Sequence, residues 1–215
     1  MDYNSLLLEA SLNGDIKKVQ HCIDNGADAY EHAMEYASKN GHIDIVKLML
    51  QKKAMNFDLT MIQASISGYF DIVKLMVDMG AKDYESALAC AKTVEIAKYL
   101  ILLGAKDYER ALYGAASTGN MDVLHLMLSL GAKDYNEAMS EASFAGKIQV
   151  IHLMLSLGAT DYEKSMRSAT IGKHFYIVQL MIDKGARDFS HYCYYYTSQE
   201  IKDYLAICQQ GKLKL

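Results

Sequence analysis

The chain has 215 residues, of which 51% are apolar and 22% are charged, a composition typical of a folded globular protein and not of a disordered one. It contains no proline, which excludes proline-rich linkers and PxxP segments, and its net charge of -4 predicts neither nucleic acid nor an anionic membrane as a partner. The four cysteines form no CxxC pair and no apolar run is long enough to span a bilayer, so we expect an intracellular protein with free thiols.

A glycine–alanine pair recurs along the chain and divides it into eight repeats. In chain order we place them at residues 2–26, 27–53, 54–80, 81–104, 105–131, 132–158, 159–185 and 186–210. One aromatic residue marks the same register in every repeat, at Tyr3, Tyr30, Phe57, Tyr84, Tyr108, Tyr135, Tyr162 and Phe189. Positions within a repeat are numbered from this residue, which is position 0. Such a fixed period predicts stacked units that bury a continuous core, with the aromatic column serving either as packing or as a ligand contact.

Each repeat is predicted to form two short helices, as the fifth illustrates. Residues 108–118 carry an apolar stripe of helical period, and Gly119 ends this first helix. A second helix is predicted over 121–130, with Leu124, Met127 and Leu128 on its buried side. Glycine at 131 then closes it in the left-handed conformation.

The fourth and eighth repeats are shorter, because each lacks about three residues between its two helices. In the fourth repeat this predicts a tightened turn near residues 91–96. The eighth repeat has Tyr196 where the other repeats have a small residue at position +7, so we expect it to cap the C-terminal end of the array. The tyrosine-rich run at 192–196 is open to two interpretations, a capping cluster or part of a binding surface.

Residues 111–132 read ALYGAASTGNMDVLHLMLSLGA, which resembles the ankyrin-repeat pattern PLHxAAxxGxxxVVxLLLxxGA, and the resemblance extends from about residue 2 to 207. It implies an all-α, ankyrin-like solenoid of about eight stacked helix-turn-helix units in a single domain over 1–215. The repeat is 27 residues instead of about 33, and only two residues separate Gly131 from Asp134, so long β-hairpin fingers are not expected. The short unit resembles the arrays of giant DNA viruses of amoebae, which implies a viral source, a host partner protein and the host cytoplasm.

No catalytic motif is present, since GxGxxG, GxxxxGK[ST], GxSxG and HExxH are all missing. We therefore predict no enzymatic activity, no cofactor and no bound metal. His125 and His152 share a column with lysine and glutamine, which indicates a solvent face and not a metal site. The acidic residues that follow the aromatic column are explained by the dipole of their own helix.

The variable positions +2, +5 and +6 of the first helices are predicted to line the groove that binds a partner, as the resemblance to ankyrin stacks implies. The candidate residues are Arg110, Tyr113, Glu137, Glu141, Lys164, Arg167, His191, Tyr194 and Tyr195. Tyrosine and arginine are frequent interface anchors. The predicted function is a non-enzymatic protein-interaction scaffold that uses the concave face of its first helices. The alternative is a structural or self-associating component of a larger viral assembly.

Overall fold

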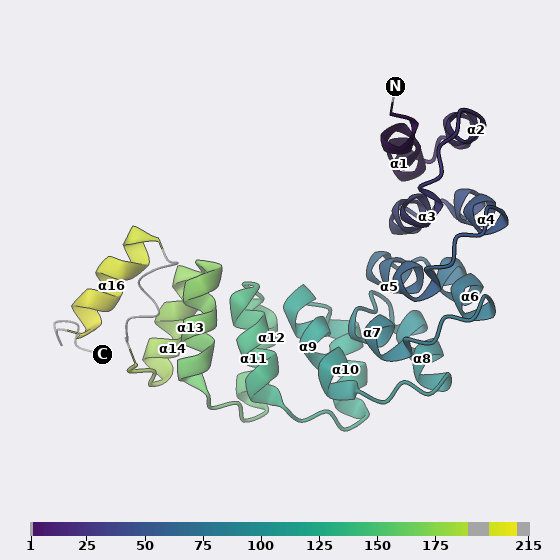
Figure 1. Cartoon of the computed structure of the whole chain (residues 1–215). Coiled ribbons are helices and arrows are strands. Elements are labelled where there is room, and N and C mark those ends of the chain that lie inside the picture. Colours follow the sequence, from purple (N-terminus) through teal and green to yellow (C-terminus); the bar gives the residue numbers. More distant parts are fainter. Residues whose placement is uncertain (1, 189–197, 210–215) are drawn as a thin grey trace. The chain divides into compact units, whose positions relative to one another are not determined.

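The computed structural model describes residues 2–188 and 198–209, and every regular element in these two ranges is an α-helix, which confirms the predicted all-α class. The chain divides into two compact bodies, residues 1–107 and 108–215, which we call the N-terminal half and the C-terminal half and describe separately (Figure 1). That all the repeats form a single domain stays a prediction.

The N-terminal half is built from four helix pairs that stack in two layers. Its helices are α1 (Tyr3–Asn13), α2 (Ile16–Asp24), α3 (Tyr30–Lys39), α4 (Ile43–Gln51), α5 (Phe57–Ser67), α6 (Phe70–Asp78), α7 (Tyr84–Ala89) and α8 (Val94–Leu102). The first helices α1, α3, α5 and α7 pack side by side in chain order, and each also packs against the second helix of its own repeat (Figure 1). The short α7 agrees with the shortening predicted for the fourth repeat.

The C-terminal half, taken by itself, is also built from stacked helix pairs. Its described helices are α9 (Tyr108–Thr118), α10 (Met121–Ser129), α11 (Tyr135–Phe144), α12 (Ile148–Ser156), α13 (Tyr162–Gly172), α14 (Phe175–Lys184) and α16 (Gln199–Gln209). Here α9, α11 and α13 form one layer of first helices, and α16 packs against α14. The tyrosine-rich run at 192–196 lies outside the described residues.

The two short repeats share one aromatic contact. The ring of Tyr99 meets that of Phe70 edge to face, with 5.2 Å between the centroids, and Tyr204 meets Phe175 in the same way at 5.1 Å. Edge-to-face contacts of this kind stabilise packing beyond the area they bury. The similarity that the sequence predicts between these repeats therefore holds for their second helices.

The core combines small and large residues of the first helices with large residues of the second helices, and each described first helix buries a leucine or methionine at position +4. Ala115 and the other described alanines at position +7 are buried, which lets neighbouring first helices approach closely. On α10, Leu124 and Met127 are fully buried as predicted. The prediction is wrong for Leu128, which is half-buried, because Val123 takes the third inward position of this helix instead.

The turn that closes each second helix requires a left-handed residue. Gly131 has φ of 100°, as predicted, and a Cβ added there would meet nothing within 4 Å. Lys53 occupies the same register in the second repeat and adopts φ of 66° despite its side chain. Because L-residues with a Cβ resist this conformation, the replacement of glycine at position 53 introduces local strain.

The polar residue at position +1 joins each repeat to the next in most of the array. The Glu109 carboxylate accepts hydrogen bonds from the backbone N–H of Lys133 at 2.8 Å and of Asp134 at 3.1 Å. The same pair of bonds is accepted by Asn4, Asp58, Glu85, Asn136 and Glu163. These side chains therefore hold the turn before the following helix, a role beyond the helix-dipole effect that the sequence predicts.

Candidate partner-binding surface

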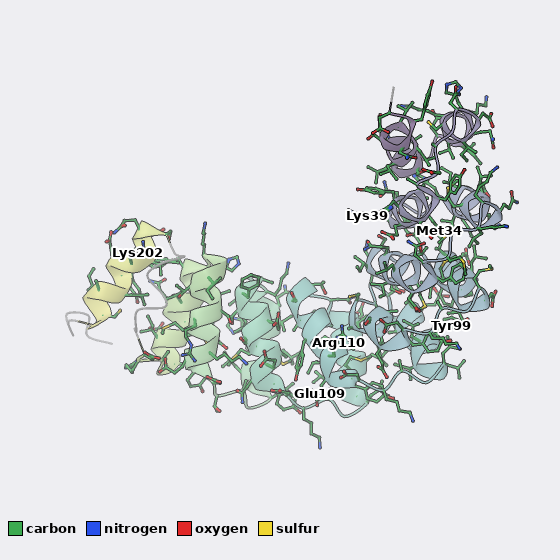
Figure 2. All side chains as sticks on the ribbon, viewed as in Figure 1. Met34, Lys39, Tyr99, Glu109, Arg110 and Lys202 are labelled. Carbon is green, nitrogen blue, oxygen red and sulfur yellow. The ribbon has the colours of Figure 1, made fainter. Side chains whose placement is uncertain are left out.

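Positions +2, +5 and +6 of α9, α11 and α13 lie on the side of each helix opposite its main buried stripe, although Ser140 at +5 of α11 is itself buried. They share a side because residues three or four apart face the same way on a helix. We call this surface the α9–α11–α13 face and define it by Arg110, Tyr113, Glu137, Ser140, Glu141, Lys164, Arg167 and Ser168. Arg110, which is labelled on α9 in Figure 2, is exposed, while Glu141 is half-buried on α11.

Tyr113 is held by the following repeat. Its hydroxyl donates a hydrogen bond of 2.8 Å to the carboxylate of Asp134, which also caps α11 by accepting from the backbone N–H of Glu137 at 3.0 Å. The pKa of Tyr113 is raised well above its usual range, mainly by partial burial and secondly by the hydrogen bond to the Asp134 carboxylate. The phenol therefore stays protonated and serves as a fixed donor between two repeats.

Arg167 makes an equivalent contact two repeats later. Its guanidinium Nη1 lies 3.5 Å from the carboxylate of Asp188, and Asp188 has the same register as Asp134. Both side chains of this ion pair remain more than 40% exposed, so its own contribution to stability is small. In both the fifth and the seventh repeat, the side chain at position +5 thus contacts the aspartate directly before position 0 of the following repeat.

Four other members of the face link α11 to α13. Lys164 forms an ion pair with Glu137, and this hydrogen bond raises the pKa of Lys164. The hydroxyls of Ser140 and Ser168 are 2.8 Å apart. The structure therefore brings Tyr113, Glu137, Lys164 and Arg167 into contacts between repeats.

The remaining three candidates, His191, Tyr194 and Tyr195, lie outside the described residues.

Two apolar residues extend this surface, and sequence reasoning missed them. Phe144 on α11 and Ile171 on α13 are each 50% exposed at position +9. A Cβ built on Gly172 would lie 2.1 Å from the carbonyl oxygen of Phe144, so the ends of α11 and α13 are in close contact. The signal was available in the sequence, because position +9 follows +2 and +5 at the i, i+3, i+7 spacing of one helix face.

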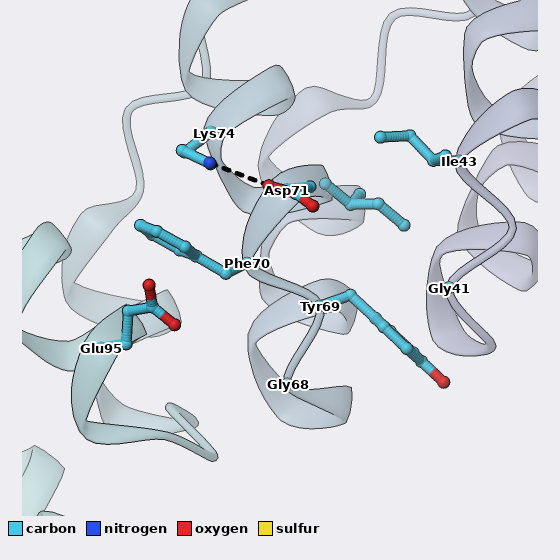
Figure 3. Close-up of a pocket in the computed structure, with 9 residues that line it drawn as sticks. Gly41, Ile43, Gly68, Tyr69, Phe70, Asp71, Lys74 and Glu95 are labelled. Atoms are coloured by element: carbon cyan, nitrogen blue, oxygen red, sulfur yellow. Dashed lines mark ion pairs between the residues drawn. The ribbon is translucent and has the colours of Figure 1, made fainter.

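An open depression of about 430 Å³ lies among α4, α6 and α8 of the N-terminal half (Figure 3). It contains an ion pair of 2.8 Å between Asp71 and Lys74, and the ammonium of Lys74 also lies 4.6 Å from the centroid of the Phe70 ring. The Lys74 hydrogen bond lowers the pKa of Asp71. A carboxylate stabilised in this way is a weaker general base.

Two other kinds of feature, a metal-binding cluster and a membrane-spanning helix, are not found in the described part of the chain. Across residues 2–188 and 198–209, no group of three His, Cys, Asp or Glu side chains is placed to hold a metal ion. Within the same ranges, no helix combines the length and apolar character needed to cross a membrane.

Comparison with known proteins adds one finding. A family model described as ankyrin repeats (three copies) matches residues 7–87, which lie within the N-terminal half. No curated protein matches the chain. With its stacked helix pairs, this part of the chain has the ankyrin-like helical fold that the sequence predicts. Ankyrin repeats generally mediate protein–protein interactions. The short viral type of repeat remains a prediction.

Proposed function

We propose that this chain is a non-enzymatic protein-interaction scaffold and that the α9–α11–α13 face binds a partner protein. The ankyrin repeats at 7–87 support the general role, since such repeats are interaction modules. The face supports the location, because it presents Arg110, Tyr113 and Arg167, residue types that often carry the binding energy of an interface.

The hydrogen bond between Tyr113 and Asp134 is the observation that carries this proposal. It fixes an aromatic side chain in one orientation while leaving part of its surface open to solvent. Side chains that are already ordered lose less conformational entropy when a partner binds. The Lys164–Glu137 ion pair orders a second part of the face in the same way.

The resemblance of the short repeat to viral arrays supports a more specific proposal. The partner is then a protein of the infected cell, and the scaffold acts in the host cytoplasm on the concave side of its first helices. This part of the proposal rests on analogy with a family, because fold alone does not determine function.

The proposal is tested by affinity purification from an extract of the source cells, followed by quantitative mass spectrometry. The test variant combines Arg110→Ala with Arg167→Ala, both at exposed positions of the face. The matched control combines His125→Ala with His152→Ala, which are exposed on the second helices of the same half. Thermal unfolding of all three proteins checks that the fold is retained.

We expect at least one cellular protein to be retained by the wild type and the histidine variant but depleted about tenfold by the arginine variant, which corresponds to about 1.4 kcal/mol of binding free energy. Equal retention by all three folded proteins would exclude the α9–α11–α13 face as the binding surface. Light scattering at several concentrations tests the alternative, because a self-assembling component would grow in mass as concentration rises.

A further inference from the structure

Helix α5 of the N-terminal half is apolar on two opposite sides. Its buried side includes Met61 and Ala64, both fully buried, whereas Leu59 is 55% exposed and Ile66 is 46% exposed. Amphipathic helices normally bury large aliphatic side chains and expose polar ones. The outward side of α5 therefore carries apolar surface that its packing within the repeat array does not use.

This outward stripe is specific to α5. Leu59, Ile62 and Ile66 occupy positions +2, +5 and +9, which lie on one side of the helix. Among the other first helices of the described ranges, none has large apolar residues at all three positions. On α3, for example, the same positions hold His32, Glu35 and Lys39. A requirement of the repeat fold would recur in each repeat, so the stripe points to an interaction.

The neighbouring helix α3 adds an aromatic group and a positive charge. Tyr36 is 39% exposed and lines an open depression of about 250 Å³ together with Gln63 of α5. Lys39 also lines this depression and projects from the side of α3 that faces away from α4, as Figure 2 shows. No described carboxylate lies within ion-pair distance of Lys39.

We propose that Tyr36, Leu59, Ile62 and Ile66, which we call the α3–α5 face, bind an amphipathic helix of a partner protein. Leu59 and Ile66 are seven residues apart, or about 10 Å along the helix axis, which is two turns of a partner helix. The partner presents apolar side chains at i, i+3 or i+4, and i+7, and places a carboxylate opposite Lys39. The inference rests on the chain being a protein-interaction scaffold, but it does not depend on the α9–α11–α13 face.

The uncharged stripe and the cation at its edge select this partner over others. An acidic residue beside the apolar anchors gains an ion pair with Lys39, whereas a basic residue there is repelled. The carboxylate of Glu35 also lines the depression beside Lys39 and keeps its negative charge, but a hydrogen bond from the side-chain amide of Asn56 holds it in place, so the partner's carboxylate is expected at Lys39 and away from Glu35.

The test selects random 16-residue peptides displayed on phage against the intact chain, with counter-selection against the Ile66→Asp variant. We expect the enriched peptides to share apolar residues at helical spacing and at least one Asp or Glu. A fluorescein-labelled peptide from this set should bind Ile66→Asp at least tenfold more weakly than the wild type, by fluorescence anisotropy. Lys39→Glu should weaken binding at least threefold, more strongly at low salt.

Ile16→Asp is the matched control, because Ile16 is 44% exposed, similar to Ile66, but lies on the second helix α2 and outside both proposed faces. The peptide should bind this variant as tightly as the wild type, and circular dichroism should show equal helix content in all variants. Enriched peptides without the apolar spacing, or equal affinity for Ile66→Asp, would overturn the proposal. A wild-type dimer in sedimentation analysis that Ile66→Asp converts to monomer would also overturn it, because a second copy would then cover the face.

Discussion

Replacing Glu109 by alanine tests whether the position +1 side chains stabilise the repeat array. The Glu109 carboxylate accepts two backbone hydrogen bonds, from Lys133 at 2.8 Å and from Asp134 at 3.1 Å. Both donors precede the first residue of α11, so their N–H groups have no partner within that helix. Glu109→Ala removes both acceptors and leaves the turn to be solvated by water.

The expected loss follows from the number and exposure of these bonds. A net contribution of about 0.5–1.5 kcal/mol for each bond gives about 2 kcal/mol for the pair, since their exposure keeps them below the range for buried charged acceptors. Removing an acid from the first helical turn costs a further 0.3–1 kcal/mol or so through the helix dipole. We therefore expect the free energy of unfolding to fall by about 2–3 kcal/mol.

Glu31 provides the matched control, because it has the same register and also lies in the first turn of its helix. Among the described contacts, its carboxylate accepts no bond from the next repeat. At this junction between the second and third repeats, the side-chain amide of Asn56 donates to the backbone carbonyl of Glu31 instead. Glu31→Ala should thus lose only the dipole contribution, and the difference between the two variants isolates the two hydrogen bonds.

The assay is urea unfolding of the intact chain, followed by circular dichroism and analysed with a model that allows the two halves to unfold separately. Glu109→Asn should recover much of the lost stability, because Asn136 already accepts both bonds through a single amide oxygen in the next repeat. Equal losses for Glu109→Ala and Glu31→Ala would show that the position +1 side chains act only within their own helix.

Three further changes are predicted. Lys53→Gly should raise the free energy of unfolding by about 0.5–1 kcal/mol, because relief of left-handed strain worth about 1–2 kcal/mol exceeds the entropy cost of glycine; a loss in urea unfolding would contradict this. Gly172→Ala should cost about 1–3 kcal/mol although alanine usually favours a helix, because its Cβ would overlap the carbonyl oxygen of Phe144; a higher melting temperature would refute this close approach. Iodoacetamide at pH 8 should label Cys90 well before Cys22, as followed by peptide mapping. The reason is that Cys90 is exposed, whereas burial raises the pKa of Cys22 and shields its thiol. Equal labelling rates would show that α2 opens readily.

The repeat register allowed much of the fold to be predicted from the sequence. The second helix of the fifth repeat was expected over 121–130, and α10 spans Met121–Ser129. Gly119 follows directly after α9 as predicted, and the structure shows Asp134 capping α11. These features are predictable because helix ends depend on local signals, namely a side-chain acceptor before the first turn and a residue that tolerates positive φ after the last.

The candidate surface was only partly predictable. The sequence placed Tyr113 and Arg167 at one register position but did not show that each contacts an aspartate at the start of the following repeat. It also did not predict the outward apolar side of α5, because an apolar residue in a helical pattern is expected to face the core.

The sequence by itself determined the period, the helix pairs and the glycine turns, since each depends on residues within one repeat. Only the tertiary structure decided which polar side chains join neighbouring repeats. Glu109 meets donors 24 and 25 residues away, and Glu31 does not make the equivalent contacts although it has the same register. The physical reason is that such bonds depend on the turn of the next repeat, where the side-chain amide of Asn56 donates to the backbone carbonyl of Glu31 instead.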